Sequence, residues 1–220
     1  MINSKKNFEA AIFDMDGTLV DSMWIWEKID IEFLNDRNLE FPNDLRKSIE
    51  YLSFVECAHY FKKRFNLSED IDTIMNIWND MAFDHYKYDV KLKPGAKEYL
   101  SFLKFSGIKI ALATSNSEQL LEVVLKRTQI FEYFDAIVTT SDVSRGKDFP
   151  DIYLLAAKKL NVYPENCVVF EDILPAVMGA KAAGMTVVGV QDDYSEKDKK
   201  LIMENADHYI NGYSELSQAV

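Results

Sequence analysis

Five short and almost continuously apolar segments constrain the fold of this 220-residue chain most strongly. Apolar residues that run on without alternation are typical of strands buried on both faces, as in parallel sheets. From the second segment onward, stretches with helical spacing of apolar residues separate them. This alternation predicts an α/β domain with a parallel sheet. The apolar segments are residues 8–13, 108–114, 136–140, 167–170 and 186–190, and the helical stretches are 117–127, 150–160 and 173–183.

The chain between the first two apolar segments has a different pattern. Residues 23–88 carry successive stripes of apolar residues at helical spacing, and Ser68 is expected to cap the last of these helices. We therefore predict an all-helical module over residues 22–90, inserted into a core formed by residues 1–21 and 91–220. The two connections between module and core are expected to lie close together and to act as a hinge.

Acidic side chains directly follow two of the predicted strands. Asp14 and Asp16 lie at the end of the first, and Glu171 and Asp172 lie at the end of the fourth. In open parallel sheets, ligands bind beyond the carboxyl ends of the strands. Four carboxylates in one place would each resist ionisation without a cation. Mg²⁺ would offset that cost, because it prefers an oxygen-only site with a few carboxylates.

Hydroxyl, amide and ammonium groups also lie at predicted strand ends. A metal-bound carboxylate, a lysine and such donors together make a cradle for a phosphate group. In that cradle, Asp14 can attack phosphorus, while Asp16 can protonate the leaving alcohol and later deprotonate water. The candidate phosphate-binding residues are Thr114, Ser115, Asn116 and Lys147.

The formal net charge of −11 disfavours partners that are themselves polyanions, so neither a nucleic acid nor an anionic membrane is expected. An anionic substrate would need local positive charge at the site. No stretch approaches the ~18 apolar residues of a membrane span, and no apolar segment of signal-peptide length is visible near residue 1. The cytoplasm and a monomeric state are the default expectations. Cys57 and Cys167 are expected to be reduced, buried thiols.

Four segments of the chain resemble, in the right order, the four motifs of the haloacid dehalogenase superfamily. They are FDMDGTLVDS, ATSN, GKDFPDIY and VVFEDILPAVMGAKAAGM. The resemblance covers essentially the whole chain. It is strongest with the phosphatases and the β-phosphoglucomutase-like members that carry a helical cap after the first motif. It implies a Rossmann-like core with the strand of Asp14 at the sheet centre, next to the strand of Asp172, and a helical cap.

The resemblance also implies a role for each acidic residue. Asp14 would be the nucleophile and a Mg²⁺ ligand. Asp16 would be the acid and base, with its backbone carbonyl on the metal. Asp172 would be a further metal ligand, and Glu171 either a ligand or the partner of Lys147.

The same resemblance places the phosphoryl group on Thr114 and Lys147. Thr114 and Asn116 are also expected to cap the helix that begins near residue 117, because capping and phosphate binding both use a helix N-terminus. Close relatives usually have a proline after the motif lysine. Asp148 follows Lys147 here, and its additional negative charge is expected to turn outward.

Cap residues decide between hydrolysis and phosphoryl transfer to a sugar. β-Phosphoglucomutases usually carry a histidine and an arginine-bearing motif in the cap. This chain has Trp24 and Trp26 near the expected histidine position and no convincing counterpart of the arginine motif. We therefore predict a Mg²⁺-dependent phosphomonoester hydrolase that acts on a small phosphorylated metabolite through an aspartyl-phosphate. A phosphosugar mutase is the alternative, and an inactive binding module is a third possibility.

Other polar and aromatic residues have less specific expectations. Trp24 and Trp26 are candidate specificity residues, with burial in the cap core as the alternative, and Trp78 and Tyr86 are expected in that core. The three histidines are expected to be structural or exposed. Residues 191–200 are expected to be a solvated helix start without a special role.

Overall fold

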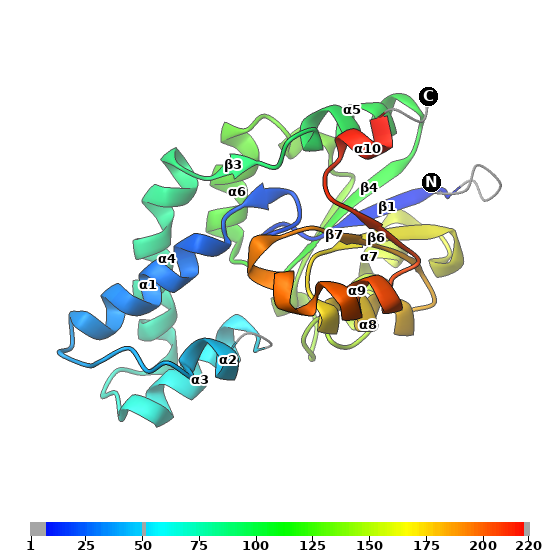
Figure 1. The fold of residues 1–220 in the computed structure, drawn as a ribbon. Coiled ribbons are helices and arrows are strands. Elements are labelled where there is room, and N and C mark those ends of the chain that lie inside the picture. Colours follow the sequence, from blue (N-terminus) through cyan, green and yellow to red (C-terminus); the bar gives the residue numbers. More distant parts are fainter. Residues whose placement is uncertain (1–7, 50–51, 218–220) are drawn as a thin grey trace.

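A six-stranded, fully parallel sheet forms the centre of the larger part of the molecule in the computed structural model, which describes residues 8–49 and 52–217 (Figure 1). The strand order is β5-β4-β1-β6-β7-β8, so the strand that precedes Asp14 is central and pairs with the strand that precedes Asp172, as expected. The strands are β1 (Ala10–Phe13), β4 (Lys109–Thr114), β5 (Ala136–Thr139), β6 (Cys167–Glu171), β7 (Thr186–Val190) and β8 (His208–Ile210).

Helices cover both faces of this sheet. Because successive side chains of a strand point to opposite faces, Phe13 packs with the apolar residues of α5, α6 and α10, while Ile12 packs with those of α7, α8 and α9. The α/β prediction, with a central parallel sheet between helices, is therefore confirmed. The helices are α5 (Ala96–Phe105), α6 (Glu118–Arg127), α7 (Asp151–Leu160), α8 (Leu174–Ala182), α9 (Lys199–Asn205) and α10 (Ser214–Ser217).

The predicted helical segment lies to one side of the sheet (Figure 1). Its helices are α1 (Met23–Asn35), α2 (Leu45–Ile49), α3 (Phe54–Phe65) and α4 (Ile71–Tyr88). Its two connections pair as short antiparallel strands, β2 (Val20–Asp21) and β3 (Lys91–Leu92). They lie side by side, as expected, whereas their action as a hinge stays a prediction.

Aromatic rings hold three of these helices, α1, α3 and α4, together. Trp78 lies edge-on to Phe33 and Phe61, with ring centroids 5.5 and 4.9 Å apart. The expected cap at Ser68 is wrong, because Asp70 caps α4 by accepting a hydrogen bond from the Thr73 backbone N–H at 2.7 Å. The segment also contacts the core directly, since α4 packs against α6.

The described residues also form four short 3₁₀ helices: η1 (Phe131–Tyr133), η2 (Thr140–Asp142), η3 (Pro164–Asn166) and η4 (Asp193–Asp198). Both cysteines are free thiols; Cys167 is buried as expected, whereas Cys57 is only partly buried. Among the helices described, none combines the length and the hydropathy that a bilayer crossing requires. Residues 1–7, 50–51 and 218–220, which belong to the predicted core and cap, lie outside the described residues.

Candidate active site

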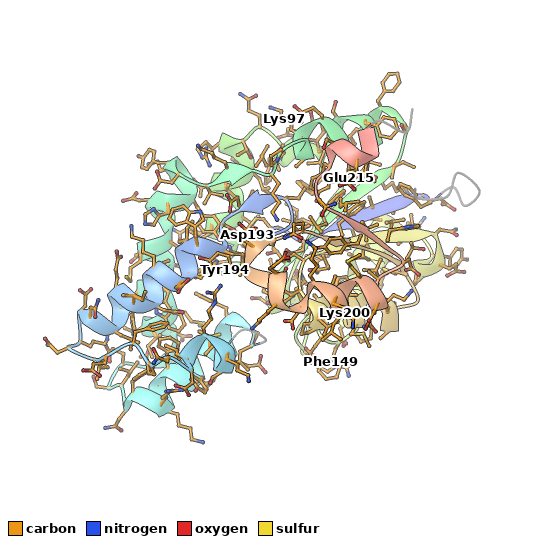
Figure 2. The ribbon with its side chains drawn as sticks, in the orientation of Figure 1. Lys97, Phe149, Asp193, Tyr194, Lys200 and Glu215 are labelled. Carbon is orange, nitrogen blue, oxygen red and sulfur yellow. The ribbon has the colours of Figure 1, made fainter. Side chains whose placement is uncertain are left out.

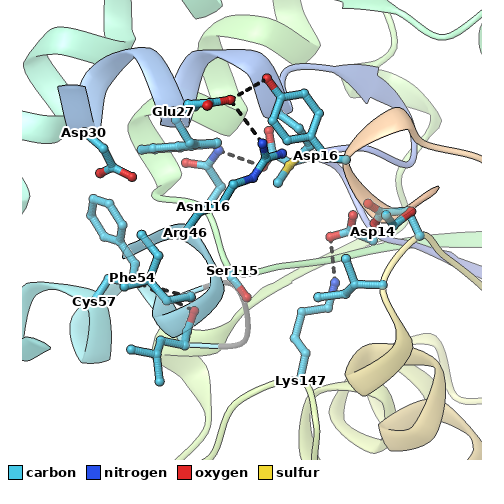
Figure 3. A pocket seen from close by; sticks show the side chains of 18 of the residues that line it. Asp14, Asp16, Glu27, Asp30, Arg46, Phe54, Cys57, Ser115, Asn116 and Lys147 are labelled. Carbon is cyan, nitrogen blue, oxygen red and sulfur yellow. Dashed lines mark hydrogen bonds and ion pairs between the residues drawn. The ribbon is translucent and has the colours of Figure 1, made fainter. Parts of the chain in front are cut away.

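A pocket of about 280 Å³ lies between the carboxyl ends of the central strands and the helices α1–α4 (Figure 3). Its volume is close to the lower limit of about 300 Å³ for small-molecule sites. The core lines it mainly with polar side chains: Asp14, Asp16, Thr114, Ser115, Asn116, Lys147, Glu171 and Asp172. The inserted helices line it mainly with aromatic and charged side chains: Trp26, Glu27, Asp30, Arg46, Phe54 and Trp78. The site residues that the sequence predicts in the α/β core therefore lie together in this pocket.

Lys147 joins two of the acidic residues. Its Nζ lies 2.6 Å from Asp14 Oδ1 (Figure 3) and also forms an ion pair with Glu171 Oε1. Burial opposes the charged form of Lys147, but the Asp14 and Glu171 carboxylates outweigh it and raise its pKa above the usual range. Burial raises the pKa of Glu171 to about 8, despite the opposing effect of Lys147. The lysine therefore stays charged at the floor of the pocket.

Asp14, Glu171 and Asp172 form a buried cluster that fits a divalent cation. Each can offer one carboxylate oxygen, and these oxygens lie within 4.8 Å of one another. Glu171 Oε2 and Asp172 Oδ2 are buried and have no hydrogen-bond partner among the described residues. Burial, followed by the charge of Asp14, raises the pKa of Asp172. A cation bound by these oxygens would give the two unpartnered oxygens a ligand and would also neutralise the buried negative charges.

Gly17 allows the first loop to approach Asp172 closely. The φ of Gly17 is +79°, and a Cβ atom at this position would lie 2.3 Å from Asp172 Oδ2. Only glycine combines this backbone conformation with the necessary space. Asp172 Oδ1 accepts a hydrogen bond from the Thr18 hydroxyl at 3.1 Å. Asp172 does not cap α8, because the position before that helix belongs to Ile173.

Asp16 lies in a network of hydrogen-bond donors. Its Oδ1 accepts hydrogen bonds from the hydroxyls of Ser22, at 2.5 Å, and Tyr86, and its Oδ2 accepts one from Asn116 Nδ2 at 2.8 Å (Figure 3). Burial, followed by the charge of Asp14, raises the pKa of Asp16. A raised pKa makes a carboxyl group a better proton donor near neutral pH.

The network contains a residue of the inserted helices that the sequence did not identify as functional. Tyr86 belongs to the last turn of α4 and is fully buried, as expected for a cap residue. Its hydroxyl nevertheless contacts both Asp16 and Asn116. No signal in the sequence distinguishes this tyrosine from an ordinary core residue, because the contact depends on how α4 meets the core.

The residues after β4 are placed as expected, but their capping role is different. Thr114, Ser115 and Asn116 all line the pocket. Ser117 caps α6 instead, because its hydroxyl accepts a hydrogen bond from the Leu120 N–H. The Thr114 hydroxyl accepts one from the Asn116 backbone N–H at 3.0 Å. The prediction that Thr114 and Asn116 cap this helix is wrong, because the cap lies one residue after Asn116 and three after Thr114.

The two candidate tryptophans differ in position. Trp26 lines the pocket and packs against the rings of Phe54 and Tyr86. Trp24 is not among the lining residues; its indole N–H donates to the Asp21 carbonyl at 3.2 Å, and its ring packs on His85. Among the residues that line this pocket, no histidine is found.

Residues 191–200 are not the solvated stretch that we expected. Tyr194, in η4, lies on the edge of the core that faces the helical segment (Figure 2), and its hydroxyl donates to Glu27 Oε2 at 3.3 Å. The Arg46 guanidinium lies 4.2 Å above the Tyr194 ring. Asp192 is buried and pairs with Lys93 at 2.9 Å. The segment follows strand β7 directly, so the rule applied to the other strand ends could have found it.

Comparisons with known proteins agree with this geometry. Residues 11–190 match the family model of the haloacid dehalogenase-like hydrolases. A phosphorylated carbohydrates phosphatase from Thermotoga maritima is 32% identical over 89% of this chain and 90% of its own. A β-phosphoglucomutase from Bacillus subtilis is 32% identical over 83% of each chain. The crystal structure of CbbY from Rhodobacter sphaeroides in complex with phosphate superposes with a TM-score of 0.85, at 25% identity and over 95% of this chain and 96% of its own.

The chain therefore belongs to the haloacid dehalogenase-like hydrolase family. The predicted resemblance, and the prediction of an enzyme of the phosphatase type in this family, are confirmed. The buried acidic cluster agrees with the divalent metal that the family generally uses.

Proposed function

We propose that this protein is a Mg²⁺-dependent phosphomonoester hydrolase that acts on a small phosphorylated metabolite, such as a sugar phosphate, through an aspartyl-phosphate. One observation carries the proposal: Asp14, Glu171 and Asp172 converge around two unpartnered buried oxygens, with Lys147 beside them at the pocket floor. Carboxylates, a lysine and nearby hydroxyl donors suit a phosphoryl group better than any neutral reacting group.

Asp14 is the proposed nucleophile. Its carboxylate would attack phosphorus, the phosphorus–oxygen bond to the leaving alcohol would break, and the alcohol would take a proton from Asp16. Water would then attack the phosphorus of the aspartyl-phosphate, lose its proton to Asp16, and release phosphate and the free Asp14 carboxylate. The donors of Thr114, Ser115, Asn116 and Lys147 are proposed to hold the phosphoryl oxygens.

The metal ion would be held by Asp14, Asp172 and the Asp16 carbonyl, and Glu171 offers a further oxygen through its unpartnered Oε2. When bound, Mg²⁺ supplies positive charge that screens the phosphoryl group from the carboxylates. Lys147 keeps Glu171 Oε1 and Asp14 Oδ1 turned toward itself. Glu171 can therefore serve both proposed roles, because Oε1 pairs with Lys147 while Oε2 is left for a metal ion.

Hydrolysis is favoured over a mutase reaction because no histidine lies among the described residues that line the pocket. Trp26, near the position in the chain where β-phosphoglucomutases usually carry a cap histidine, lines the pocket instead. Several curated relatives are named phosphatases, including hexitol phosphatase B of Escherichia coli, 27% identical over 98% of this chain. The mutase alternative is represented by the relative named β-phosphoglucomutase. A cytoplasmic monomer remains our expectation for the state in which the enzyme acts.

A panel of phosphorylated metabolites and aryl phosphates tests the proposal. We expect phosphate release that is lost after treatment with a chelator and restored by Mg²⁺. Conversion of β-glucose 1-phosphate to glucose 6-phosphate that depends on a sugar bisphosphate would favour the mutase instead. The absence of turnover with every compound would contradict both reactions.

A further inference from the structure

We propose that Asp30 selects substrates whose leaving group ends in neutral hydroxyl groups, and that it rejects leaving groups with a second negative charge. The inference rests on the proposed phosphatase function of the same pocket. Asp30 belongs to α1 and lines the pocket on the side away from Asp14 and Lys147 (Figure 3). A substrate with its phosphoryl group at Asp14 would therefore direct its other end toward Asp30.

Asp30 has no hydrogen-bond or ion-pair partner among the described residues, although it is partly buried. Its neighbour Glu27 differs, because Glu27 Oε2 accepts hydrogen bonds from Arg46 and from the Tyr194 hydroxyl, each at 3.3 Å. The nearby Cys57 thiol donates toward the Ile49 and Leu52 carbonyls. The carboxylate oxygens of Asp30 therefore accept no hydrogen bond from the described residues.

An unpaired carboxylate in such a position destabilises the folded protein. Burial, followed by the charge of Glu27, raises the pKa of Asp30 to about 7. Hydroxyl groups of a ligand would supply the missing donors, and hydrogen bonds to a charged acceptor are stronger than those between neutral groups. The cost of Asp30 in the free protein is then offset when the substrate binds, as is common for residues retained for function.

The walls beside Asp30 are aromatic. Phe54 lies 5.7 Å from the Trp26 ring and 5.6 Å from the Trp78 ring, measured between centroids, and all three residues line the pocket. Apolar walls with a few placed polar groups are typical of small-molecule sites. They would contact the carbon chain of a polyol, while Asp30 accepts its hydroxyl protons.

A second anionic group would meet repulsion at this end of the pocket. Among the described residues of the inserted helices, Arg46 is the cation that lines the pocket, but Glu27 balances its charge and its guanidinium covers the Tyr194 ring. Above its pKa of about 7, Asp30 therefore carries a negative charge that no described side chain pairs with. Like charges placed next to each other in a binding site cost several kcal/mol.

The test compares two substrates of equal length, each phosphorylated at one terminal carbon. Glucitol 6-phosphate ends in a hydroxymethyl group, and 6-phosphogluconate ends in a carboxylate. At about pH 8, where Asp30 is ionised, we expect the wild-type enzyme to have a kcat/KM at least about tenfold higher for the first. Asp30→Asn should reduce this ratio at least about fivefold, mainly by improving turnover of the carboxylate substrate. Asp80→Asn removes the same charge from an exposed position of α4 and should leave the ratio unchanged.

Thermal stability gives a second readout that a purely structural role would not produce. Since the pKa of Asp30 is raised, its destabilising effect is largest above that pKa and fades as the pH falls toward its ordinary value. Asp30→Asn should therefore raise the Tm, and by more at about pH 8 than at about pH 5. A lower Tm at both pH values would show that Asp30 supports the fold instead.

The remaining outcomes separate this inference from the proposed function. Phosphate release with an unchanged substrate ratio in Asp30→Asn would overturn the inference and leave the phosphatase intact. A preference of more than about tenfold for an aminoalcohol phosphate over glucitol 6-phosphate would also overturn it, because the selected group would then be a cation. No release from either compound or from an aryl phosphate would contradict the proposed function itself.

Discussion

The two ends of the pocket differ in how their carboxylates are held. At the core end, Asp14 and Glu171 share Lys147, and Asp16 accepts three hydrogen bonds. At the end formed by the inserted helices, the surroundings are aromatic and Asp30 has no partner among the described residues. A chemical site requires groups fixed before the substrate arrives, whereas a specificity site can leave groups for the substrate to satisfy.

The largest effect should come from the core end. Asp14→Asn removes the proposed nucleophile while keeping its size, and we expect phosphate release to fall by at least about a thousandfold. The control is Asp148→Asn, which follows Lys147 directly in the chain but is exposed to solvent; it should retain nearly full activity. Residual activity of Asp14→Asn within about tenfold of the wild type would mean that Asp14 is not the nucleophile and that the core end is not the reaction site.

A smaller loss is expected when the support of Lys147 is disturbed. A Cβ atom on Gly179 of α8 would lie 2.1 Å from the Lys147 carbonyl oxygen, so Gly179→Ala must displace this loop. We expect a stability loss of about 1–3 kcal/mol and a fall in kcat/KM of about 10- to 100-fold. Gly212→Ala, where the added atom meets nothing within 4 Å, is the matched control. Unchanged kinetics in Gly179→Ala would show that the position of Lys147 matters little.

Tyr86→Phe tests the hydrogen bond from the Tyr86 hydroxyl, on the inserted helix α4, to Asp16 at the core end of the pocket. Loss of the hydroxyl leaves Ser22 and Asn116 to hold Asp16. We expect kcat to fall about tenfold for alkyl phosphates, whose leaving groups need a proton, and to change little for p-nitrophenyl phosphate. Tyr163→Phe, at an exposed position, should affect neither substrate. Equal losses with both substrates would mean that Tyr86 acts through the fold rather than on Asp16.

The smallest effect should come from the rim of the pocket. Arg46→Gln removes the contacts of Arg46 with Glu27 and with the Tyr194 ring, which join α2 to α1 and to the core. Because the pair is exposed, its contribution is about 0–1 kcal/mol, so KM should rise by no more than about fivefold with kcat unchanged. Lys47→Gln is the control on the same helix. A large fall in kcat would instead mean that Arg46 takes part in the reaction at the core end of the pocket.

The sequence predicts the two ends of the pocket unequally, for a physical reason. Parallel strands bring their carboxyl ends together, so the placement of Asp14, Thr114 and Asp172 could be inferred from where each strand ends. The pairing of the central strands followed from the family resemblance.

The other end depends on packing between helices that are far apart in the chain. Tyr86 and Asp30 fit ordinary helical positions, one apolar and one polar. Only the packing of the inserted helices against the core brings Asp30 to the pocket and the Tyr86 hydroxyl to Asp16. Tyr194 could have been found, because it follows a strand, but the charged residues around it resemble a solvated surface.

A quenched reaction analysed by mass spectrometry tests whether Asp14 becomes phosphorylated during turnover. Asp16→Asn, given an aryl phosphate whose leaving group needs no proton, should form the aspartyl-phosphate and hydrolyse it slowly. We expect the peptide containing Asp14 to gain the mass of one phosphoryl group, and the same peptide of Asp14→Asn to gain none. Phosphate release by Asp16→Asn at the wild-type rate, with no phosphorylated peptide at any time, would show that Asp14 is not a covalent nucleophile.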